Sequence, residues 1–495
     1  MGNSTGNLKD LWDLFRTSPR IIGGCIWDYK DQGLLKKDSL GNEFYAYGGD
    51  YGEKYHDDNF CINGIVASDG RPKASIYECK RVFQPIECTW VDQNSRIIGI
   101  ENRHSIRNAS LYEAVIEFLQ DGVAFRKITL PSIDLEAGEK IDLDLNPWLP
   151  IFTNRSEYHL NIRFLLKDDM FWAPKGFEIA SNQLSLSDLS VKGVEVERNA
   201  ELELKQDEKG YTLVGGNFTI VFDTSNGALS SYNWRGFEQI FSPLVPSFTR
   251  PITDNDDRGW KPQIKLKEWY DAVPRLRSMS LISHNKSRIV LESIYQVVEN
   301  KAEAIICYTI YGDGDIHVDY KLSASTNLPN IPKVGMTCGI ANDYRQITWL
   351  GRGPMENYID KRYASDVARY SMSLDKFIEP YVMPQENGNR TDVRWMILAN
   401  SHKQGLTITA DSLLSMSAWP YTLANINKAN HTNELIESGF ITLNIDLIQM
   451  GVGGNDSWTD VAAPLEIYQI PAKDYHYSFT IHPVDYKDNG LPHSP

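Results

Sequence analysis

The chain has 495 residues, a length that suits about three domains, and 23% of them are charged while 42% are hydrophobic, as in globular proteins generally. No apolar run reaches the roughly 18 residues that a membrane-spanning helix requires. The formal net charge of −15 argues against a nucleic acid or an anionic membrane as partner, because binding to either depends on Lys and Arg side chains that neutralise phosphate.

The six cysteines are scattered, with no C-x-x-C pair and no spacing typical of a disulfide framework. We therefore interpret them as buried free thiols. This interpretation favours a reducing compartment, the cytoplasm, and it is also compatible with the periplasm. No targeting segment opens the chain, an observation that carries no weight where a longer protein precedes Met1.

The first 86 residues have the pattern of an α/β structure. Asn7 is placed to cap a helix whose third residue is Asp10, and Pro19 ends that helix. The run "IIGGCIWDY" predicts a strand buried on both faces, as in a parallel sheet. A polar and aromatic loop (residues 30–72) leads to a second helix, "KASIYECKRVF". One strand and two helices cannot bury their own apolar faces, so the region is predicted to be an incomplete part of a larger domain.

From about residue 88 the hydrophobic period changes to two. "LYEAVIEFLQ-DG-VAFRKITL" predicts a hairpin around an Asp-Gly turn, and "EYHLNIRFLL" alternates cleanly. Short strands separated by turns predict an immunoglobulin-like β-sandwich over residues 88–185. After a polar boundary, stretches such as "GGNFTIVFDTSNGALSSYNW" and "FITLNIDLIQM" predict one large antiparallel two-sheet domain over residues 205–488. The fold class is therefore mainly β.

The first six residues, "MGNSTG", contain the G-x-S-x-G pattern of the nucleophile elbow in serine hydrolases. That motif requires a strand that delivers the serine to a sharp turn on a mostly parallel sheet. Only Met1 precedes Gly2, and mostly antiparallel β-structure follows the second helix. Ser4 is therefore not predicted to be a nucleophile.

Other patterns that carry chemistry are weak. A retaining glycosidase needs two carboxyl groups held about 5–5.5 Å apart. Four glutamates are available, but nothing in the local pattern pairs any two of them: Glu53, Glu78, Glu356 and Glu386. No H-E-x-x-H motif or Cys/His cluster has metal-ligand spacing. We interpret the acidic cluster Asp254, Asp256 and Asp257 as a structured turn rather than a set of ligands.

Several stretches, read together, resemble one family. "MGNS", "GGCIWDYKDQGL" and "AYGGDYGEKYHDDNFCINGIVASDGRPKASIYECK" resemble the end of the catalytic barrel in large bacterial β-galactosidases of glycoside hydrolase family 2. "TWLGRGPMENYIDKR", "PYVMPQENGNRTDVRW" and "MGVGGNDSW" resemble the C-terminal β-domain of the same enzymes. The resemblance covers nearly the whole chain. It implies a partial (β/α)8-barrel remnant (1–86), an immunoglobulin-like sandwich (88–185) and a large antiparallel supersandwich like that of galactose mutarotases (205–488).

The resemblance also implies where the catalytic groups lie. In the family, "MGN" ends a longer motif, Glu-Tyr-x-His-x-Met-Gly-Asn, whose Glu is the nucleophile. That Glu would lie five positions before Met1, and the acid/base Glu would lie further upstream. No catalytic residue is therefore expected in this chain, the chain alone is expected to be inactive, and Ser4 becomes a residue that leads into the first helix.

Sugar-binding residues follow from the same resemblance. Trp27, in "GGCIWDY", resembles the tryptophan that forms an apolar floor under the galactose ring, where the C–H face of a sugar packs on an indole. Its alternative role is a core residue of the barrel. Trp458, in "GGNDSW", resembles the tryptophan that stacks on the second sugar, and its alternative is a core residue of the sandwich.

Ion ligands are implied as well. Phe60 and Asn63, in "NFCING", resemble positions that bind Na⁺ through the Phe backbone carbonyl and the Asn side-chain oxygen. The family's third protein ligand, an upstream Asp, is not in this chain. Where some relatives have Asn four residues before the sodium-site Phe, this chain has His56, which departs from the pattern of an outer Mg²⁺ site. The principal Mg²⁺ ligands of the family lie upstream.

The function that the resemblance implies is that of the C-terminal part of a retaining β-galactosidase acting on terminal non-reducing β-D-galactose in lactose-type substrates. The expected partners are β-galactoside sugars, the missing N-terminal half of the enzyme and further copies in a homo-oligomer. The alternative class is a stand-alone carbohydrate-binding or mutarotase-like sandwich protein. His317 and Glu386 are available for that chemistry, although no family pattern marks them.

Overall fold

A computed structural model describes residues 2–3, 5–153, 156–187, 198 and 200–485. Ser4 lies outside the described residues. The chain divides into two compact units. The large unit takes its described residues from 1–76, 193–362 and 370–493, and the small unit takes its described residues from 77–192 and 363–369. Among the described residues, no helix combines the length and the apolar character that crossing a membrane demands.

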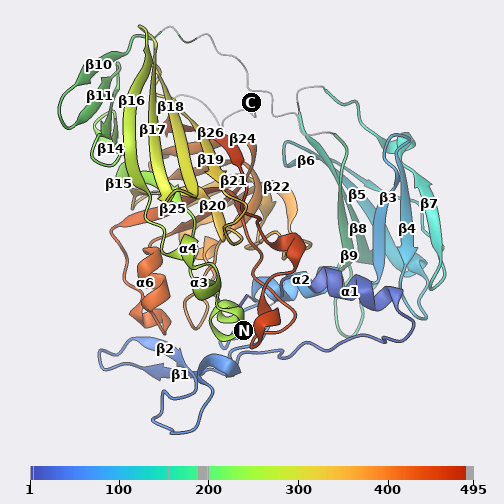
Figure 1. Cartoon of the computed structure of the whole chain (residues 1–495). Helices are drawn as coiled ribbons and strands as arrows, with labels where there is room; N and C mark the ends of the chain where they lie inside the picture. The colour runs from blue at the N-terminus through green and yellow to red at the C-terminus, as the bar shows by residue number, and fades with distance from the viewer. Residues whose placement is uncertain (1, 4, 154–155, 188–197, 199, 486–495) are drawn as a thin grey trace. The chain divides into compact units, whose positions relative to one another are not determined.

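The small unit is an immunoglobulin-like sandwich of two antiparallel sheets (Figure 1). One sheet has the order β3-β4-β7 and the other the order β6-β5-β8-β9. The strands are β3 (Ile86–Asp92), β4 (Ile97–Asn102), β5 (Tyr112–Gln120), β6 (Val123–Thr129), β7 (Lys140–Asp144), β8 (Tyr158–Leu166) and β9 (Glu178–Ser185). Alternate side chains of both sheets, among them Ile100, Ile116 and Ile162, form one buried core.

The hairpin predicted around the Asp-Gly turn is confirmed as β5–β6. Asp121 and Gly122 both have positive φ, 49° and 75°. Two successive residues in this conformation match the right-handed twist of the strands they join, and glycine reaches it without steric cost. The turn chemistry visible in the sequence therefore fixes the register of this hairpin.

The large unit is built mainly from β10–β26, which hydrogen-bond into a single 17-stranded assembly of the described residues. Its strands are β10 (Glu203–Gln206), β11 (Gly210–Val214), β12 (Phe218–Asp223), β13 (Ala228–Trp234), β14 (Phe237–Glu238), β15 (Ile240–Ser247), β16 (Arg275–His284), β17 (Arg288–Val298), β18 (Ala302–Tyr311), β19 (Ile316–Ala324), β20 (Lys333–Ala341), β21 (Gln346–Gly353), β22 (Asp366–Ser373), β23 (Arg390–Ala399), β24 (Gln404–Trp419), β25 (Phe440–Gln449) and β26 (Tyr475–Asp485). The ladders β17–β18, β19–β26 and β20–β25 all run antiparallel, as predicted for this part of the chain.

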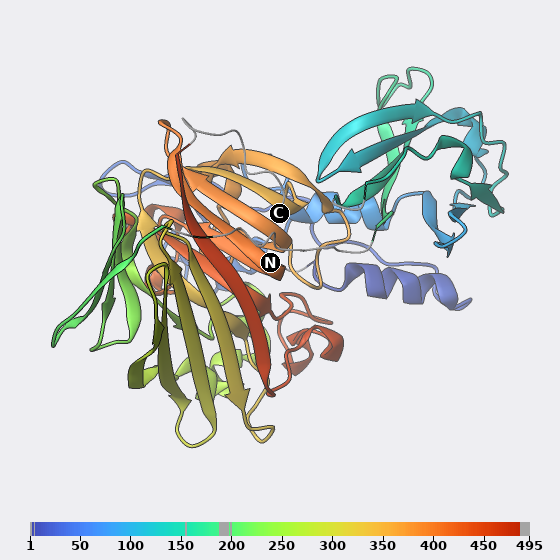
Figure 2. The ribbon, with the colours of Figure 1, turned by 90° about the horizontal axis from the view of Figure 1, so that it is seen from above.

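The assembly curls because its longest strand changes partners. The first part of β24, Gln404–Ala410, pairs with β26, whereas its last part, Ser415–Trp419, pairs with β25. Figure 2 shows the yellow strands and the orange strands on different sides of this unit. Strands β17 and β18 alternate between buried and half-buried residues, the period of two expected for a sheet with one face on a core.

The remaining helices of the large unit are short. They are α3 (Pro262–Lys265), α4 (Lys267–Tyr270), α5 (Leu374–Phe377) and α6 (Leu423–Lys428). Trp269 of α4 and Phe377 of α5 are buried in the core of the β-assembly. The helices therefore act as covers on the sheet rather than as a separate layer.

The N-terminal region contributes α1 (Leu8–Thr17), β1 (Leu34–Lys37), β2 (Glu43–Ala46) and α2 (Ala74–Val82). The hairpin β1–β2 lies within the stretch predicted to be a loop, and Figure 1 shows it below α6. Asp50, soon after β2, meets the His431 imidazole at 2.8 Å, and the Tyr47 hydroxyl donates to the Asn430 carbonyl at 2.8 Å. The hairpin is thus attached to the segment after α6.

Two local predictions for this region are wrong. The run Ile21–Tyr29 does not form a doubly buried strand, and the Ile22 side chain is fully exposed. A strand of that kind needs hydrogen-bonded neighbours on both sides, whereas within the described residues Ile21 bonds only to the nearby Ser18 carbonyl and the last part of the run bonds to the segment of Asn63. Asn7 stands at the start of α1 with φ 56° and gives no side-chain cap; its backbone N–H instead donates to the Asp360 carbonyl at 2.7 Å.

Candidate functional site

A short parallel backbone pairing joins the segment after Trp27 to the segment of Asn63. The Asp28 N–H donates to the Asn63 carbonyl at 3.0 Å, and the Ile65 N–H donates to the Asp28 carbonyl at 3.1 Å. A Cβ on Gly64 would lie 2.2 Å from the Asp31 nitrogen, so only glycine allows the two backbones to approach this closely. Trp27 and Asn63 are therefore held on adjacent segments of chain.

A buried ion pair supports this pairing from within. The Lys73 ammonium lies 2.6 Å from Asp31 Oδ2, and both side chains are almost completely buried. Asp31 Oδ1 accepts the Gly64 N–H at 2.8 Å, and the Lys73 ammonium donates to the Gly64 carbonyl at 3.0 Å. Paired and hydrogen-bonded charges of this kind fix geometry, because any displacement leaves a buried charge without its partner.

Trp458 lies against the same region, although it is almost 400 residues away in the sequence. Its ring meets the Phe60 ring edge-on, with 5.9 Å between the ring centroids. The Arg258 guanidinium lies 5.8 Å from the centroid of the same Phe60 ring and donates to Asn59 Oδ1 at 2.8 Å. The structure therefore brings Trp458 to the helical turn that carries Phe60, three residues before Asn63.

Both tryptophans are open to solvent: 81% of Trp27 and 61% of Trp458 is exposed. The alternative that Trp458 is a core residue of the sandwich is wrong. In the described part of the chain, Asn63 Oδ1 is buried and has no hydrogen-bond partner. We call Trp27, Phe60, Asn63 and Trp458 the aromatic cluster, which combines two exposed indoles with one buried oxygen that has no hydrogen-bond partner among the described residues.

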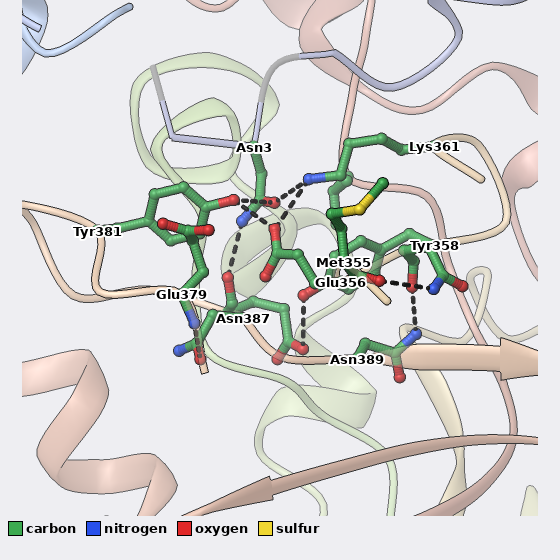
Figure 3. A network of polar contacts seen from close by, with 12 residues as sticks. Asn3, Met355, Glu356, Tyr358, Lys361, Glu379, Tyr381, Asn387 and Asn389 are labelled. Atoms are coloured by element: carbon green, nitrogen blue, oxygen red, sulfur yellow. Dashed lines mark hydrogen bonds and ion pairs between the residues drawn. The ribbon is translucent and has the colours of Figure 1, made fainter. Parts of the chain in front are cut away.

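A buried polar network surrounds Asn3 in the same unit (Figure 3). Asn3 Nδ2 donates to the Glu386 carbonyl at 2.7 Å, while Asn3 Oδ1 accepts the Lys361 ammonium at 2.8 Å and the Tyr381 hydroxyl at 3.0 Å. All four residues are buried. The amide of Asn3 thus uses both of its polar atoms to connect the start of the chain to the segments before and after α5.

Glu356 is the anion of this network. Its Oε1 accepts the Lys361 ammonium at 3.0 Å and the Tyr381 hydroxyl, and its Oε2 accepts the Gly388 N–H at 2.8 Å. Burial by itself raises the pKa of Glu356, but the attraction of Lys361 and these hydrogen bonds together hold the pKa below its ordinary value. Glu356 is therefore ionised and fully engaged, and Figure 3 shows its carboxylate enclosed by partners.

Glu386 has the opposite electrostatic character. Its side chain is buried and accepts the Tyr358 hydroxyl at 3.2 Å. Burial raises the pKa of Glu386 to about 7, even though the Arg250 charge acts to lower it. Glu356 and Glu386 thus share one network, but neither is accessible to a sugar.

Asp254 links this network to the aromatic cluster. Its Oδ2 accepts the Gly2 N–H at 2.7 Å and Gln385 Nε2 at 2.9 Å, and its Oδ1 accepts Asn59 Nδ2 at 2.5 Å. Asn59 directly precedes Phe60. Asp254 therefore joins the start of the chain, the segment before Phe60 and the segment after α5.

The other acidic residues are structural. Asp256 Oδ1 accepts the Trp260 indole N–H at 3.1 Å, and its Oδ2 forms an ion pair with Arg250 at 3.2 Å, both partners being buried. Residues Asp256–Trp260 form a π-helical turn, in agreement with the interpretation of the acidic cluster as a structured turn. Within the described ranges, no group of three or more His, Cys, Asp and Glu side chains could hold a metal ion.

The pair named for mutarotase-like chemistry is not built as a site. His317 on β19 meets Asp411 Oδ2 on β24 at 2.8 Å, whereas Glu386 is enclosed in the buried network. Sequence reasoning assigned no role to Asn3 or Lys361 and interpreted Asp254 only as part of a structured turn. Asn3 and Lys361 lie in stretches that carry the family resemblance. This resemblance is the sequence signal that could have pointed to them.

Comparison with known proteins gives three family matches. Residues 214–481 match a model described as beta galactosidase small chain, residues 1–88 match the TIM barrel domain of glycosyl hydrolases family 2, and residues 98–187 match domain 4 of beta-galactosidase. The first of these matches alone spans more than half of the chain.

Individual relatives agree. The chain is 32% identical to a beta-galactosidase of Priestia megaterium over 487 residues, covering 98% of this chain and 47% of the relative. It is 32% identical to a beta-galactosidase of Halalkalibacterium halodurans over 495 residues, covering 98% of this chain and 48% of the relative. The chain thus spans about half the length of these curated relatives. A galactose mutarotase related enzyme from Lactobacillus acidophilus superposes with a TM-score of 0.33 at 9% identity, over 57% of this chain and 100% of the other.

Proposed function

Because the chain belongs to the β-galactosidases of glycoside hydrolase family 2, we propose that it forms the C-terminal part of a retaining β-galactosidase that releases terminal non-reducing β-D-galactose. In this proposal the chain supplies sugar subsites and part of a sodium site, and the two catalytic glutamates belong to the N-terminal half. The observation that carries the proposal is the aromatic cluster, in which Trp27, Asn63 and Trp458 come from distant parts of the sequence to adjoining segments.

Two exposed indoles in one region need an explanation. An exposed tryptophan buries little of its large apolar surface, so its presence contributes little to folding. A sugar ring offers a C–H face that packs on an indole, as the walls of sugar sites commonly do. We assign Trp27 to the galactose subsite and Trp458 to the subsite of the leaving sugar, the aglycone.

Sodium binding is proposed for Phe60 and Asn63. The support is the buried Asn63 Oδ1, which has no hydrogen-bond partner in the described part of the chain. A buried oxygen in this state is costly unless it binds a donor or a cation, and carbonyl oxygens are hard ligands suited to an alkali ion. A sodium ion held by Asn63 Oδ1 and the Phe60 carbonyl would add a fixed positive charge to the galactose subsite. Mg²⁺ is proposed to be held by ligands outside this chain.

The retaining reaction needs a nucleophilic carboxylate and an acid/base carboxyl group on opposite sides of the scissile bond. Glu356 and Glu386 do not suit these roles, because both are buried within the network around Asn3. The chain alone is therefore proposed to be inactive. Its contribution to the reaction is to bind and orient galactose and the leaving sugar beside the glutamates of the other half.

A hybrid enzyme tests the proposal. The part of the Priestia megaterium β-galactosidase that precedes its match is fused in front of this chain, and hydrolysis of an aryl β-galactoside is measured for the hybrid and for each piece. The hybrid is expected to be active and both pieces inactive. Hydrolysis by the purified 495-residue chain, or a folded hybrid with no hydrolysis, would contradict the proposal.

Site variants of the hybrid complete the test. Trp27→Ala is expected to abolish most activity, and Asn63→Ala is expected to remove the difference between assays in sodium chloride and in choline chloride. Lys267→Met, a change at an exposed ion pair with Asp271, serves as the matched control and should leave activity and the sodium response unchanged. An Asn63→Ala hybrid with an intact sodium response would rule out the sodium site.

A further inference from the structure

Asp360 connects two segments that lie far apart in the sequence. Its buried carboxylate Oδ2 accepts the N–H groups of Val452 and Gly453, both at 2.8 Å. Its backbone carbonyl accepts the Asn7 N–H at 2.7 Å. One residue therefore holds the beginning of the 451–458 loop, which ends in Trp458, and the beginning of α1.

The two segments also pack backbone to backbone. A Cβ on Gly6 would lie 2.1 Å from Asp360 Oδ2 and 2.5 Å from the Gly453 nitrogen, and a Cβ on Gly453 would lie 2.5 Å from the Gly6 Cα. Contacts this short leave no room for any side chain. Both glycines are therefore required for Asp360 to reach the loop.

Other buried groups hold the same end of the loop. Arg250 Nη2 donates to the Gly451 carbonyl at 3.1 Å, and Asn255 Nδ2 donates to the Val452 carbonyl at 3.1 Å. The far end of the loop is exposed, and Trp458 meets Phe60 only through the edge-on ring contact. The position of the Trp458 ring thus depends on how the loop leaves its buried end and on Asp456, whose carboxylate accepts the Trp458 N–H at 3.1 Å and the Thr459 N–H at 3.0 Å.

We propose that Asp360 is a positioning residue that sets the orientation of Trp458, and thereby the affinity for the aglycone, by holding Val452 and Gly453 against residues 5–7. The role in affinity rests on the proposed function, because it takes Trp458 as the surface on which the aglycone stacks. The role in holding the loop rests on the contacts of this chain alone. The two parts are tested separately.

Hydrogen exchange of the 495-residue chain tests the structural part. Asp360→Ala removes a charged acceptor shared by two amides, so exchange of Val452 and Gly453 should accelerate about tenfold or more. Asp360→Asn keeps one acceptor oxygen and should restore slow exchange. Asp315→Ala, which removes a carboxylate that serves His482 and Arg198 instead, is the control and should leave these amides unchanged. Slow exchange of Val452 and Gly453 in folded Asp360→Ala would overturn the proposal.

Gly453→Ala is a second variant, which perturbs the loop and keeps the Asp360 carboxylate. The added methyl group collides with the Gly6 backbone, so the loop should shift and the amides of residues 454–458 should exchange faster. This variant keeps the proposal testable where Asp360→Ala does not fold. Unchanged exchange in the loop of Gly453→Ala would contradict the close packing on which the proposal depends.

The hybrid enzyme tests the role in affinity. Asp360→Ala and Trp458→Ala should each weaken glucose binding as an acceptor by about tenfold, the double variant should be no weaker than either single variant, and galactose inhibition should stay the same. Additive losses, or equal losses for glucose and galactose, would overturn this role. An inactive hybrid with native residues defeats the proposed function, whereas normal exchange in Asp360→Ala defeats only the positioning role.

Discussion

The aromatic cluster and the network around Asn3 lie in the same unit and differ in almost every physical respect. The indoles of the cluster are exposed and make few contacts, whereas Asn3, Glu356, Lys361 and Tyr381 are buried and bonded to one another. Rigidity and the proposed binding surface are therefore supplied by different residues. In the proposed function the exposed aromatic groups bind sugar, and the buried network holds the backbone that carries them.

Asp254 links the network around Asn3 to the aromatic cluster. It is bonded to Gly2, beside Asn3, and to Asn59, beside Phe60. A change in the network therefore reaches the cluster through the side chains of Asp254 and Asn59. Substitutions in the two regions should accordingly separate stability from sugar binding.

The largest effect is expected from breaking the buried ion pair. Glu356→Leu leaves the Lys361 ammonium without its anion, and removal of one partner of a buried pair typically costs about 3–5 kcal/mol. Urea unfolding of the 495-residue chain measures this loss. The double variant Glu356→Leu/Lys361→Met should recover part of it, and the exposed control Lys267→Met should change the free energy of unfolding by less than about 0.5 kcal/mol. A loss below 1 kcal/mol for Glu356→Leu, on the order of a surface substitution, would show that the network does not hold this region.

A pH-dependent effect of intermediate size is expected at Glu386. Its pKa is about 7 in the folded chain against an ordinary 4.5, so the native state holds the proton more tightly and this contribution to stability is lost as pH rises from about 4.5 to 7. Relative to Glu386→Gln, which does not titrate, the native chain should lose about 3 kcal/mol between pH 4 and pH 8, at 1.36 kcal/mol per unit.

Glu356→Gln is the matched control for this experiment, with the opposite sign. The pKa of Glu356 is lowered, so its contribution to stability is present above the unfolded value and is lost as pH falls through the folded value. Relative to the native chain, Glu386→Gln should therefore gain free energy of unfolding as pH rises, whereas Glu356→Gln should gain it as pH falls. Parallel pH profiles for the native chain and Glu386→Gln would contradict the burial of an ionisable Glu386.

The smallest effect on stability is expected for the exposed indoles. Trp27→Ala and Trp458→Ala remove side chains that bury little surface, so the free energy of unfolding should change by less than about 1 kcal/mol. Trp349→Ala removes a completely buried indole of the same size and should cost about 3–5 kcal/mol. Thermal and urea unfolding compare the three variants. A loss for Trp458→Ala as large as that for Trp349→Ala would mean that Trp458 is a structural residue.

The sequence predicted the β-structure well where local signals decide it. The Asp-Gly turn is a short-range feature that sets the register of the β5–β6 hairpin directly, and the period of two in β5 and β8 is likewise a local signal. The prediction for Ile21–Tyr29 failed because a buried strand depends on neighbours that no local pattern supplies. Asn7 failed as a cap because its backbone, bonded through its N–H to the carbonyl of Asp360 more than 350 residues away, has φ 56° instead of the extended conformation that lets a cap side chain reach the helix N–H groups.

The candidate site, like the fold, could be predicted only in part from the sequence. The residues of the aromatic cluster were found only through the family resemblance, since composition and spacing gave no reason to connect Trp27 with Trp458. The network around Asn3 was missed because its members are separated by as many as 383 positions and are linked only by the tertiary structure. Long-range polar contacts leave no periodic trace in a sequence.

Ligand discrimination by the hybrid enzyme tests the central claim most directly. Inhibition by galactose and acceptor binding of glucose are measured for the native hybrid, Trp27→Ala and Trp458→Ala. Stacking on an indole is worth about 0.5–1.5 kcal/mol, so Trp458→Ala should weaken glucose binding by up to about tenfold and leave galactose unchanged. Trp27→Ala should weaken galactose binding itself. Equal effects of the two substitutions on both sugars, or no effect of either, would contradict the assignment of Trp27 and Trp458 to separate sugar subsites.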